Sequence, residues 1–289
     1  MPTTRVRAVA RTEALLIGGL IGLVALAWIV ERALSPGAPV HLGDVPALVL
    51  CAVPALVWLG YFYLQDRHEP EPKEYVLAVY LLGAFVAWPL ARFVTALWPA
   101  ATFAGGPLTP RSVFAAIVPG GLAQELAKYL VVRYSVYMSD EFDEPMDGIV
   151  YMTAAGIGFA TAENWHAIRA AGGTVFLAVG TMNIVVATLA HGCFAGVLGY
   201  ALGIARWTWA ARRGPVILIG LLIAATLNGV FSLVDDQVRM AGMTVQPWRS
   251  VAFATVFAGA VFAITYALMR RHLAASPMAT ADRGGPSGE

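Results

Sequence analysis

Apolar runs of roughly 20 residues follow one another along most of the chain, and no other feature limits the fold as strongly. An α-helix rises about 1.5 Å per residue, so a run of this length crosses the roughly 30 Å hydrocarbon core of a bilayer. Only 13% of the 289 residues are charged, whereas soluble domains average about 25%. The sequence therefore predicts an all-α, polytopic membrane protein.

The runs predict about eight transmembrane helices in one membrane-embedded domain that covers residues 1–275. Their ranges are 14–30, 45–64, 75–98, 111–134, 147–168, 174–205, 215–234 and 251–269. The sixth range is longer than one crossing needs, and we expect it to begin with an amphipathic or re-entrant piece that ends near Asn183. Residues 276–289 are polar and contain Gly, Ser and Pro, which predicts a disordered cytoplasmic tail.

Positively charged residues in the loops predict the orientation, because cytoplasmic loops of membrane proteins are enriched in Lys and Arg. If the chain starts inside the cell, the inner segments carry twelve Lys and Arg residues and the outer segments carry five. Both termini are therefore expected in the cytoplasm. The sequence has no basic stripe interleaved with aromatic residues, so it indicates no nucleic-acid partner.

Several polar side chains fall inside the predicted spans, where a charged group is costly and is usually paired or functional. Measured from the inner end of each helix, the depth is roughly 14 Å for Glu125, roughly 20 Å for His191 and Asn228, and roughly 24 Å for Glu163. Four helices thus carry polar groups at compatible heights, which predicts one shared site near the middle of the bilayer. The candidate residues are Gln124, Glu125, Lys128, Glu163, Asn164, His191 and Asn228.

Each of these residues also has a structural explanation. Glu125 and Lys128 lie three residues apart on one helical face and could form a neutralising ion pair. Glu163 could be protonated, His191 could be a hydrogen-bonded core residue, and Asn228 could join two helices. Two carboxylates and a histidine at one depth favour a functional site over packing alone.

At these positions the sequence resembles the PrsW family of intramembrane proteases, which is related to the CAAX-processing and bacteriocin-processing membrane proteases. The family pattern has Glu-Glu-x-x-Lys in one span, and residues 124–128 read QELAK. It continues with an acidic junction and Phe-x-x-x-Glu-Asn, matched by FDEPMDGIVY at 142–151 and FATAEN at 159–164. The stretches DRHEPEP at 66–72 and HGCF at 191–194 are also similar to the family. The resemblance covers the chain from about residue 60 to residue 235.

The resemblance implies an endopeptidase of the bacterial cytoplasmic membrane that cleaves membrane-anchored proteins, with anti-sigma factors as the usual substrates. Either Glu125 or Glu163 would act as a general base on water. His191 would polarise the scissile carbonyl or bind a metal ion, and Asn228 would donate to the oxyanion. A zinc ion held by the two glutamates and the histidine, and a metal-free mechanism, are both compatible with these residue types.

Two positions depart from the family pattern and keep a second hypothesis open. The first Glu of the pair is Gln124, which cannot act as a base, and a late histidine is replaced by Asn228. The second hypothesis is a catalytically impaired relative that acts as a membrane scaffold or regulator. A proton-coupled transporter is a third hypothesis, because carboxylates at depth are common in transporters, although no internal repeat is evident. Lys128 and Asn164 would have supporting roles in a protease site.

Overall fold

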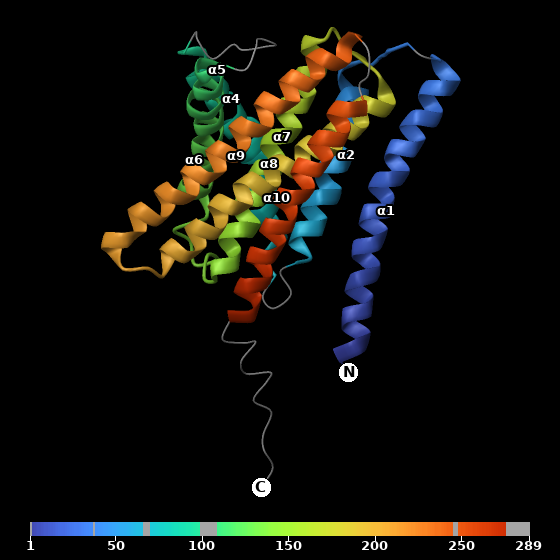
Figure 1. Ribbon diagram of the computed structural model, residues 1–289. Coiled ribbons are helices and arrows are strands. Elements are labelled where there is room, and N and C mark those ends of the chain that lie inside the picture. Colours follow the sequence, from blue (N-terminus) through green and yellow to red (C-terminus); the bar gives the residue numbers. More distant parts are fainter. Residues whose placement is uncertain (1, 37, 66–69, 99–108, 245–247, 276–289) are drawn as a thin grey trace.

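The computed structural model describes residues 2–36, 38–65, 70–98, 109–244 and 248–275, and these residues are almost entirely helical (Figure 1). The α-helices are α1 (Pro2–Leu34), α2 (Asp44–Tyr63), α3 (Lys73–Leu82), α4 (Trp88–Ala96), α5 (Pro110–Ala115), α6 (Ala123–Ser135), α7 (Pro145–Ala170), α8 (Leu177–Arg206), α9 (Ala210–Thr244) and α10 (Trp248–Ala275). Two π-helical segments, η1 (Gly83–Ala87) and η3 (Ala116–Leu122), join α3 to α4 and α5 to α6. The predicted all-α fold is confirmed.

Within these residues the helices form eight rods, because α3, η1 and α4 follow one another without a break, as do α5, η3 and α6. Eight is the predicted number of transmembrane helices. Five rods are long and apolar enough to cross a bilayer on length and composition alone, namely Ala14–Leu34, Asp44–Tyr63, Lys73–Ala96, Leu177–Arg206 and Ala210–Leu233. The predicted disordered tail, residues 276–289, lies outside the described residues.

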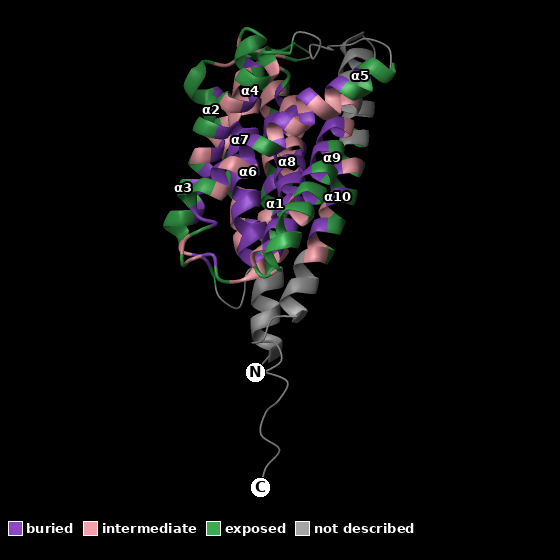
Figure 2. Cartoon of the chain, turned by 90° about the vertical axis from the view of Figure 1, so that its left-hand side faces the viewer, coloured by how far each residue is buried: buried purple, intermediate pink, exposed green. Residues whose placement is uncertain are grey.

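Helices α7 and α8 form the middle of the bundle. Figure 2 shows the buried residues concentrated on these two helices and the exposed residues at the periphery. In the most apolar 18-residue stretch of α8, 72% is buried inside the protein, compared with 11% in the corresponding stretch of α1. The apolar side chains on the outer side of α1 are therefore not covered by other described residues, as expected for a helix that faces lipid. Helix α1 begins and α10 ends at the same end of the bundle (Figure 1).

Glycines allow α7 and α8 to pack backbone against backbone. A Cβ atom on Gly199 would overlap the carbonyl oxygen of Gly148, and one on Gly203 would overlap that of Pro145. On the other helix, a Cβ atom on Gly156 would lie 2.5 Å from the carbonyl oxygen of His191. Small residues at such contacts are typical of helix pairs in membranes. This contact fixes α7 against the segment of α8 that carries His191.

The expectation of a re-entrant piece before the sixth span is wrong. Helix α8 is continuous from Leu177 to Arg206, and residues Thr174–Val175 form a short strand, β2, paired with β1 (Val40–His41). The carboxylate of Glu31 on α1 accepts a hydrogen bond from the backbone nitrogen of Ala178 at 2.9 Å, which satisfies one of the free N–H groups in the first turn of α8. A long apolar helix can cross a bilayer by tilting, so its length alone does not require a break.

Candidate active site

The polar residues of three rods meet in the interior of the bundle. Helix α6 brings Glu125 and Lys128, α8 brings His191, and α9 brings Asn228. Glu125, Lys128 and Asn228 have no exposed surface, and His191 is 7% exposed. Gln124, at the start of α6, is half-buried at the edge of this group. The shared depth expected from the sequence is therefore matched by direct contacts between these five side chains.

Lys128 is the centre of the cluster. Its ammonium group donates to Glu125 Oε1 at 2.6 Å and lies 3.2 Å from His191 Nδ1. It also lies 4.7 Å from the centre of the Phe159 ring, which is a cation–π contact. A buried ammonium group needs a partner for each of its three N–H groups, and here a carboxylate, an imidazole and a ring face provide them. The ion pair considered from the spacing of Glu125 and Lys128 is present.

The contact with Lys128 determines which nitrogen of His191 carries the proton. An ammonium group can only donate, so Nδ1 must accept, and the proton of a neutral imidazole then lies on Nε2. His191 has no other hydrogen bond to the described residues, and Nε2–H is therefore free to donate to a ligand. This geometry suits a group that polarises a carbonyl oxygen.

Asn228 holds the start of α6 through its side-chain amide. Its Nδ2 atom donates to Glu125 Oε1 at 2.7 Å and to Gln124 Oε1 at 3.1 Å. The carboxylate of Glu125 fixes this orientation of the amide, because the opposite one would place two acceptor oxygens together. Both amide hydrogens of Asn228 are thus engaged inside the protein. They are not free for an oxyanion, which is the role that the family resemblance implies for this residue.

Two buried oxygen atoms of the cluster have no hydrogen-bond partner in the described part of the chain. They are Glu125 Oε2 and Asn228 Oδ1. Buried acceptors of this kind cost on the order of 1–3 kcal/mol each, and in native structures they usually bind a water molecule or a ligand. The cluster is therefore a place where one further donor fits.

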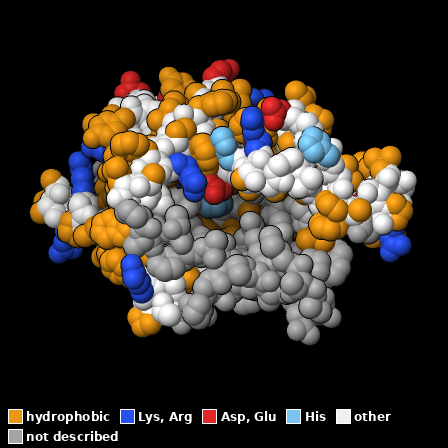
Figure 3. Space-filling model, turned by 90° about the horizontal axis from the view of Figure 1, so that it is seen from above, with side chains coloured by type: hydrophobic (Ala, Val, Ile, Leu, Met, Phe, Trp, Pro, Cys, Tyr) orange, Lys and Arg blue, Asp and Glu red, His pale blue; other side chains and the backbone are white. Residues whose placement is uncertain are grey.

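Glu163 and Asn164 lie beside this cluster and not within it. The indole nitrogen of Trp88 on α4 donates to Glu163 Oε2, and Asn164 donates to the hydroxyl of Thr188 at 3.3 Å. Glu163 is half-buried, and it interacts electrostatically with Lys128 without contacting it. Figure 3 looks down on the end of the bundle where α7 ends, and it shows basic, acidic and histidine side chains gathered near the middle of that face.

Sequence reasoning did not identify Trp88 as part of this region. An indole in an apolar span gives no signal by itself, since aromatic residues are common in membrane helices. Phe159 was noted only as part of a motif, yet its ring contacts both Lys128 and His191, with 5.3 Å between the Phe159 and His191 ring centres. Phe159 and Glu163 are four residues apart on α7, which is one helical turn. This spacing is the signal that could have placed Glu163 one turn along α7 from the residue that contacts His191.

The π-helical segment η3 brings α9 to the cluster. Pro119 has no backbone N–H, and Gly120 and Gly121 follow it, so the regular helical hydrogen bonding is interrupted there. A Cβ atom on Gly121 would overlap the carbonyl oxygen of Ala225 on α9. A Cβ atom on Gly229 would lie 2.6 Å from the Cα atom of Ile117. This close approach places Asn228 within hydrogen-bond distance of Glu125.

Replacing Gly229→Ala should therefore lower stability by about 1–3 kcal/mol, because the new methyl group pushes α9 away from η3. The matched control is Gly214→Ala on the same helix, where no atom lies within 4 Å of the added carbon and no loss is expected. Thermal unfolding of the purified variants in detergent measures both. Equal unfolding temperatures for Gly229→Ala and the native protein would contradict the close contact.

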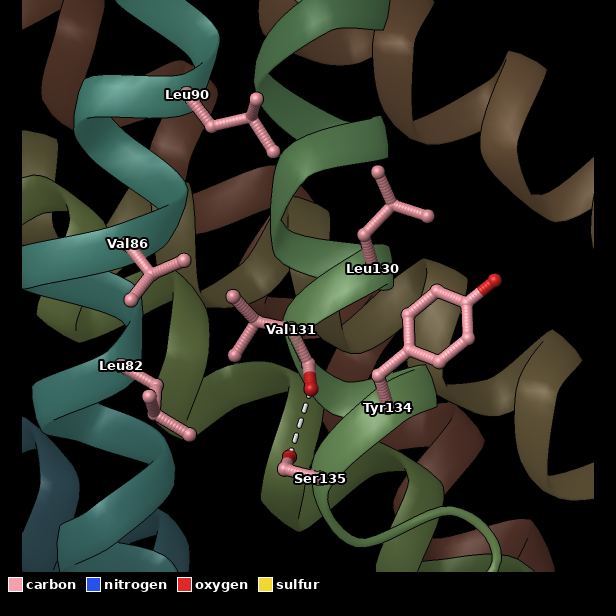
Figure 4. Close-up of a pocket in the computed structure, with 7 residues that line it drawn as sticks. All are labelled: Leu82, Val86, Leu90, Leu130, Val131, Tyr134 and Ser135. Atoms are coloured by element: carbon pink, nitrogen blue, oxygen red, sulfur yellow. Dashed lines mark hydrogen bonds between the residues drawn. The ribbon is translucent and has the colours of Figure 1, made fainter.

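An apolar pocket of about 290 Å³ lies outside the cluster, between α6 and the rod formed by α3, η1 and α4 (Figure 4). Its lining residues are Leu82, Val86, Leu90, Leu130, Val131, Tyr134 and Ser135. None of these side chains is charged, and the Ser135 hydroxyl donates to the backbone oxygen of Val131. The pocket is lined mainly by aliphatic side chains and contains no carboxylate, histidine or lysine.

Comparison with known proteins connects this geometry to one family. The family model described as PrsW family intramembrane metalloprotease matches residues 71–258. A protein called Protease PrsW from Geobacillus kaustophilus (strain HTA426) is 32% identical over 178 residues, which are 62% of this chain and 74% of that relative. Proteins of the same name from Bacillus subtilis (strain 168) and Clostridioides difficile (strain 630) are 28% and 27% identical, over 78% and 77% of their lengths and 63% and 64% of this chain. No solved structure matches the chain.

The family description names a metalloprotease, which implies a metal ion such as zinc. A catalytic zinc ion takes three protein ligands, usually His, Cys, Asp or Glu. The described residues contain no group of three such side chains that could hold one. Of the three ligands considered from the sequence, Glu125 and His191 both contact the Lys128 ammonium, and Glu163 binds Trp88. The residues as placed do not fit a zinc ion.

Proposed function

Because the chain belongs to the PrsW family of intramembrane proteases, we propose that it hydrolyses a peptide bond of a membrane-anchored protein inside its helix bundle. Glu163 is the general base that activates water, and His191 polarises the scissile carbonyl. One observation carries this proposal: Glu163, a half-buried carboxylate with no cation in contact among the described residues, lies one helical turn along α7 from Phe159, which contacts His191. The Nε2–H of His191 is free.

Glu163 is favoured over Glu125 as the base for two physical reasons. Glu125 Oε1 lies 2.6 Å from the Lys128 ammonium group and also accepts a hydrogen bond from Asn228, so this oxygen is already engaged inside the protein. Glu125 also has no exposed surface, so it does not face bulk water. Glu163 is only half-buried and contacts no cation, since one of its oxygens is bound by Trp88 and the other has no partner in the described residues.

The separation between Glu163 and His191 agrees with their proposed roles. A base and a carbonyl-polarising group need space between them for one water molecule and the substrate carbonyl. Phe159 contacts the His191 ring, and Glu163 lies four residues later on the same face, about 6 Å further along the helix axis. Two side chains in direct contact would leave no such space.

The reaction follows from these positions. Glu163 removes a proton from water, and the oxygen attacks the carbonyl carbon of the scissile bond. The Nε2–H group of His191 and the side-chain N–H₂ of Gln124 donate to the developing oxyanion. The C–N bond then breaks as Glu163 returns its proton to the leaving amine. Gln124 takes the donor role here because both amide hydrogens of Asn228 are already engaged.

The remaining residues hold this arrangement. Glu125 anchors Lys128, Lys128 fixes the tautomer of His191, and Asn228 holds Glu125 and Gln124. No step uses a metal ion, because no three potential ligands among the described residues are placed to hold one. Loss of cleavage on chelation, reversed by added zinc, would contradict this part of the proposal.

The proposed setting is the bacterial cytoplasmic membrane, with both termini in the cytoplasm and anti-sigma factors among the substrates. The excess of Lys and Arg in the inner segments supports the orientation. Reporter fusions after Arg213 and after Arg271 should report a cytoplasmic location, and a periplasmic signal from either fusion would overturn it.

Proteolysis by the purified protein in lipid vesicles tests the proposed function. A substrate with one membrane span should be cut, and hydrolysis in ¹⁸O-labelled water should place one labelled oxygen in the new C-terminus. The variant His191→Phe should bind the substrate and cleave it at least about a hundredfold more slowly. If the native protein binds single-span substrates and leaves them intact, the scaffold hypothesis replaces the protease.

A further inference from the structure

Trp88 contacts both Glu163 and the residue one turn beyond it. The indole N–H donates to Glu163 Oε2. The indole ring also stacks on the ring of His166, with 3.8 Å between the ring centres and 8° between the planes. Glu163 and His166 are three residues apart on α7 and therefore share a face of that helix. One side chain from α4 thus fixes two neighbouring polar groups of α7.

The backbone around Trp88 is held firmly against α7. Trp88 is the first residue of α4 and follows the π-helical segment η1. A Cβ atom on Gly83, where η1 begins, would overlap the carbonyl oxygen of Ala155. One on Gly158 would overlap that of Tyr80. In one contact the glycine belongs to η1 and in the other it belongs to α7, and together they hold the rod formed by α3, η1 and α4 closely against α7. The position of the indole relative to Glu163 is therefore set by packed backbone.

We propose that Trp88 is a positioning residue that orients the carboxylate of Glu163 for catalysis. By binding one oxygen, it directs the other toward the water molecule and limits the rotation of the side chain. This inference rests on the proposed role of Glu163 as the general base.

The other charged and titratable groups near Glu163 do not duplicate this contact. Lys128 on α6 and His166 on α7 both interact electrostatically with Glu163, while Arg169 on α7 and Arg92 on α4 interact with His166. None of them forms a hydrogen bond or ion pair with the carboxylate of Glu163 in the described residues. Removing the indole N–H should therefore leave Glu163 without a replacement donor.

Trp88→Phe tests the inference, because it removes the N–H group and keeps a flat ring beside His166. We expect kcat to fall about tenfold or more with little change in KM, since hydrogen bonds to charged groups are among the stronger ones. Trp88→His restores a ring N–H and should recover most of the lost rate.

Trp58→Phe is the matched control. Its indole N–H also donates a hydrogen bond, to the backbone oxygen of Val185 at 3.1 Å, but it lies away from Glu163. This variant should keep the native kcat and KM. A native kcat for Trp88→Phe would overturn the positioning role, and so would equal rates for the folded Trp88→Phe and Trp88→His variants. Unfolding temperatures are measured for all variants, and if Trp88→Phe does not fold, a Trp88→His variant with less than a tenth of the native rate overturns the inference.

Glu163→Gln separates this inference from the function on which it rests. If Glu163→Gln cleaves at the native rate, the proposed function fails and Trp88 has no base to position. If Glu163→Gln is inactive while Trp88→Phe keeps the native kcat and KM, only the positioning role is lost. In the Glu163→Gln background, Trp88→Phe should cause no further loss of residual rate, because the two residues act as one unit.

Discussion

Glu163→Gln should reduce cleavage of a single-span substrate by at least about a hundredfold, the usual cost of losing a general base. The amide has nearly the shape of the carboxylate, so the indole of Trp88 can still donate to its oxygen. The substitution removes the ability to take a proton from water, because a side-chain amide does not act as a base near neutral pH. Initial rates in lipid vesicles measure the effect.

The control for this change is Glu74→Gln on the exposed side of α3. It makes the same chemical substitution and should leave the rate unchanged within about twofold, as expected for a surface position. Both variants should unfold at the native temperature. A Glu163→Gln variant that cleaves as fast as the control would show that another group activates the water.

Lys128→Met should destabilise the protein by about 3–5 kcal/mol and abolish cleavage. Methionine has a similar length but no charge, so the fully buried Glu125 carboxylate would lose its ion-pair partner. His191 would also lose the donor that sets its tautomer. Denaturation in mixed detergent measures the loss of stability, and the vesicle assay measures the rate.

A second substitution distinguishes the charge from the packing. Lys128→Met combined with Glu125→Leu removes both charges, and replacing a whole buried pair by apolar groups is often neutral. The double variant should therefore recover most of the stability and none of the activity. If Lys128→Met alone is as stable as the native protein, the ion pair does not organise this cluster.

The sequence predicted the fold class because apolar length is a direct physical requirement of crossing a bilayer. It also indicated which residues could meet, since depth follows from position along a helix. Glu125, His191 and Asn228 lie on three helices, and the structure connects them through Lys128 and the Asn228 amide. The spacing of Glu125 and Lys128 was enough to suggest their ion pair.

Depth alone does not give the direction in which a side chain points. The estimated depth of Glu163 was compatible with the other residues, yet its carboxylate binds Trp88 and lies beside the cluster. The π-helical segments η1 and η3 precede Trp88 and Gln124, and each shifts the angular register of the helix that follows. Such a shift cannot be read from hydrophobic periodicity, which assumes 3.6 residues per turn. The sequence likewise does not show that both amide hydrogens of Asn228 are engaged by Gln124 and Glu125.

Restoring the base from solution tests the central claim most directly, namely that Glu163 is the water-accessible base and Glu125 is a buried anchor. In Glu163→Ala, formate can enter the space left by the half-buried side chain and replace its carboxylate. In Glu125→Ala the space is fully enclosed. The measurement is the cleavage rate of both variants in lipid vesicles as formate concentration rises at constant pH and ionic strength. The account predicts a formate-dependent increase for Glu163→Ala and none for Glu125→Ala. An increase for Glu125→Ala with none for Glu163→Ala would contradict it.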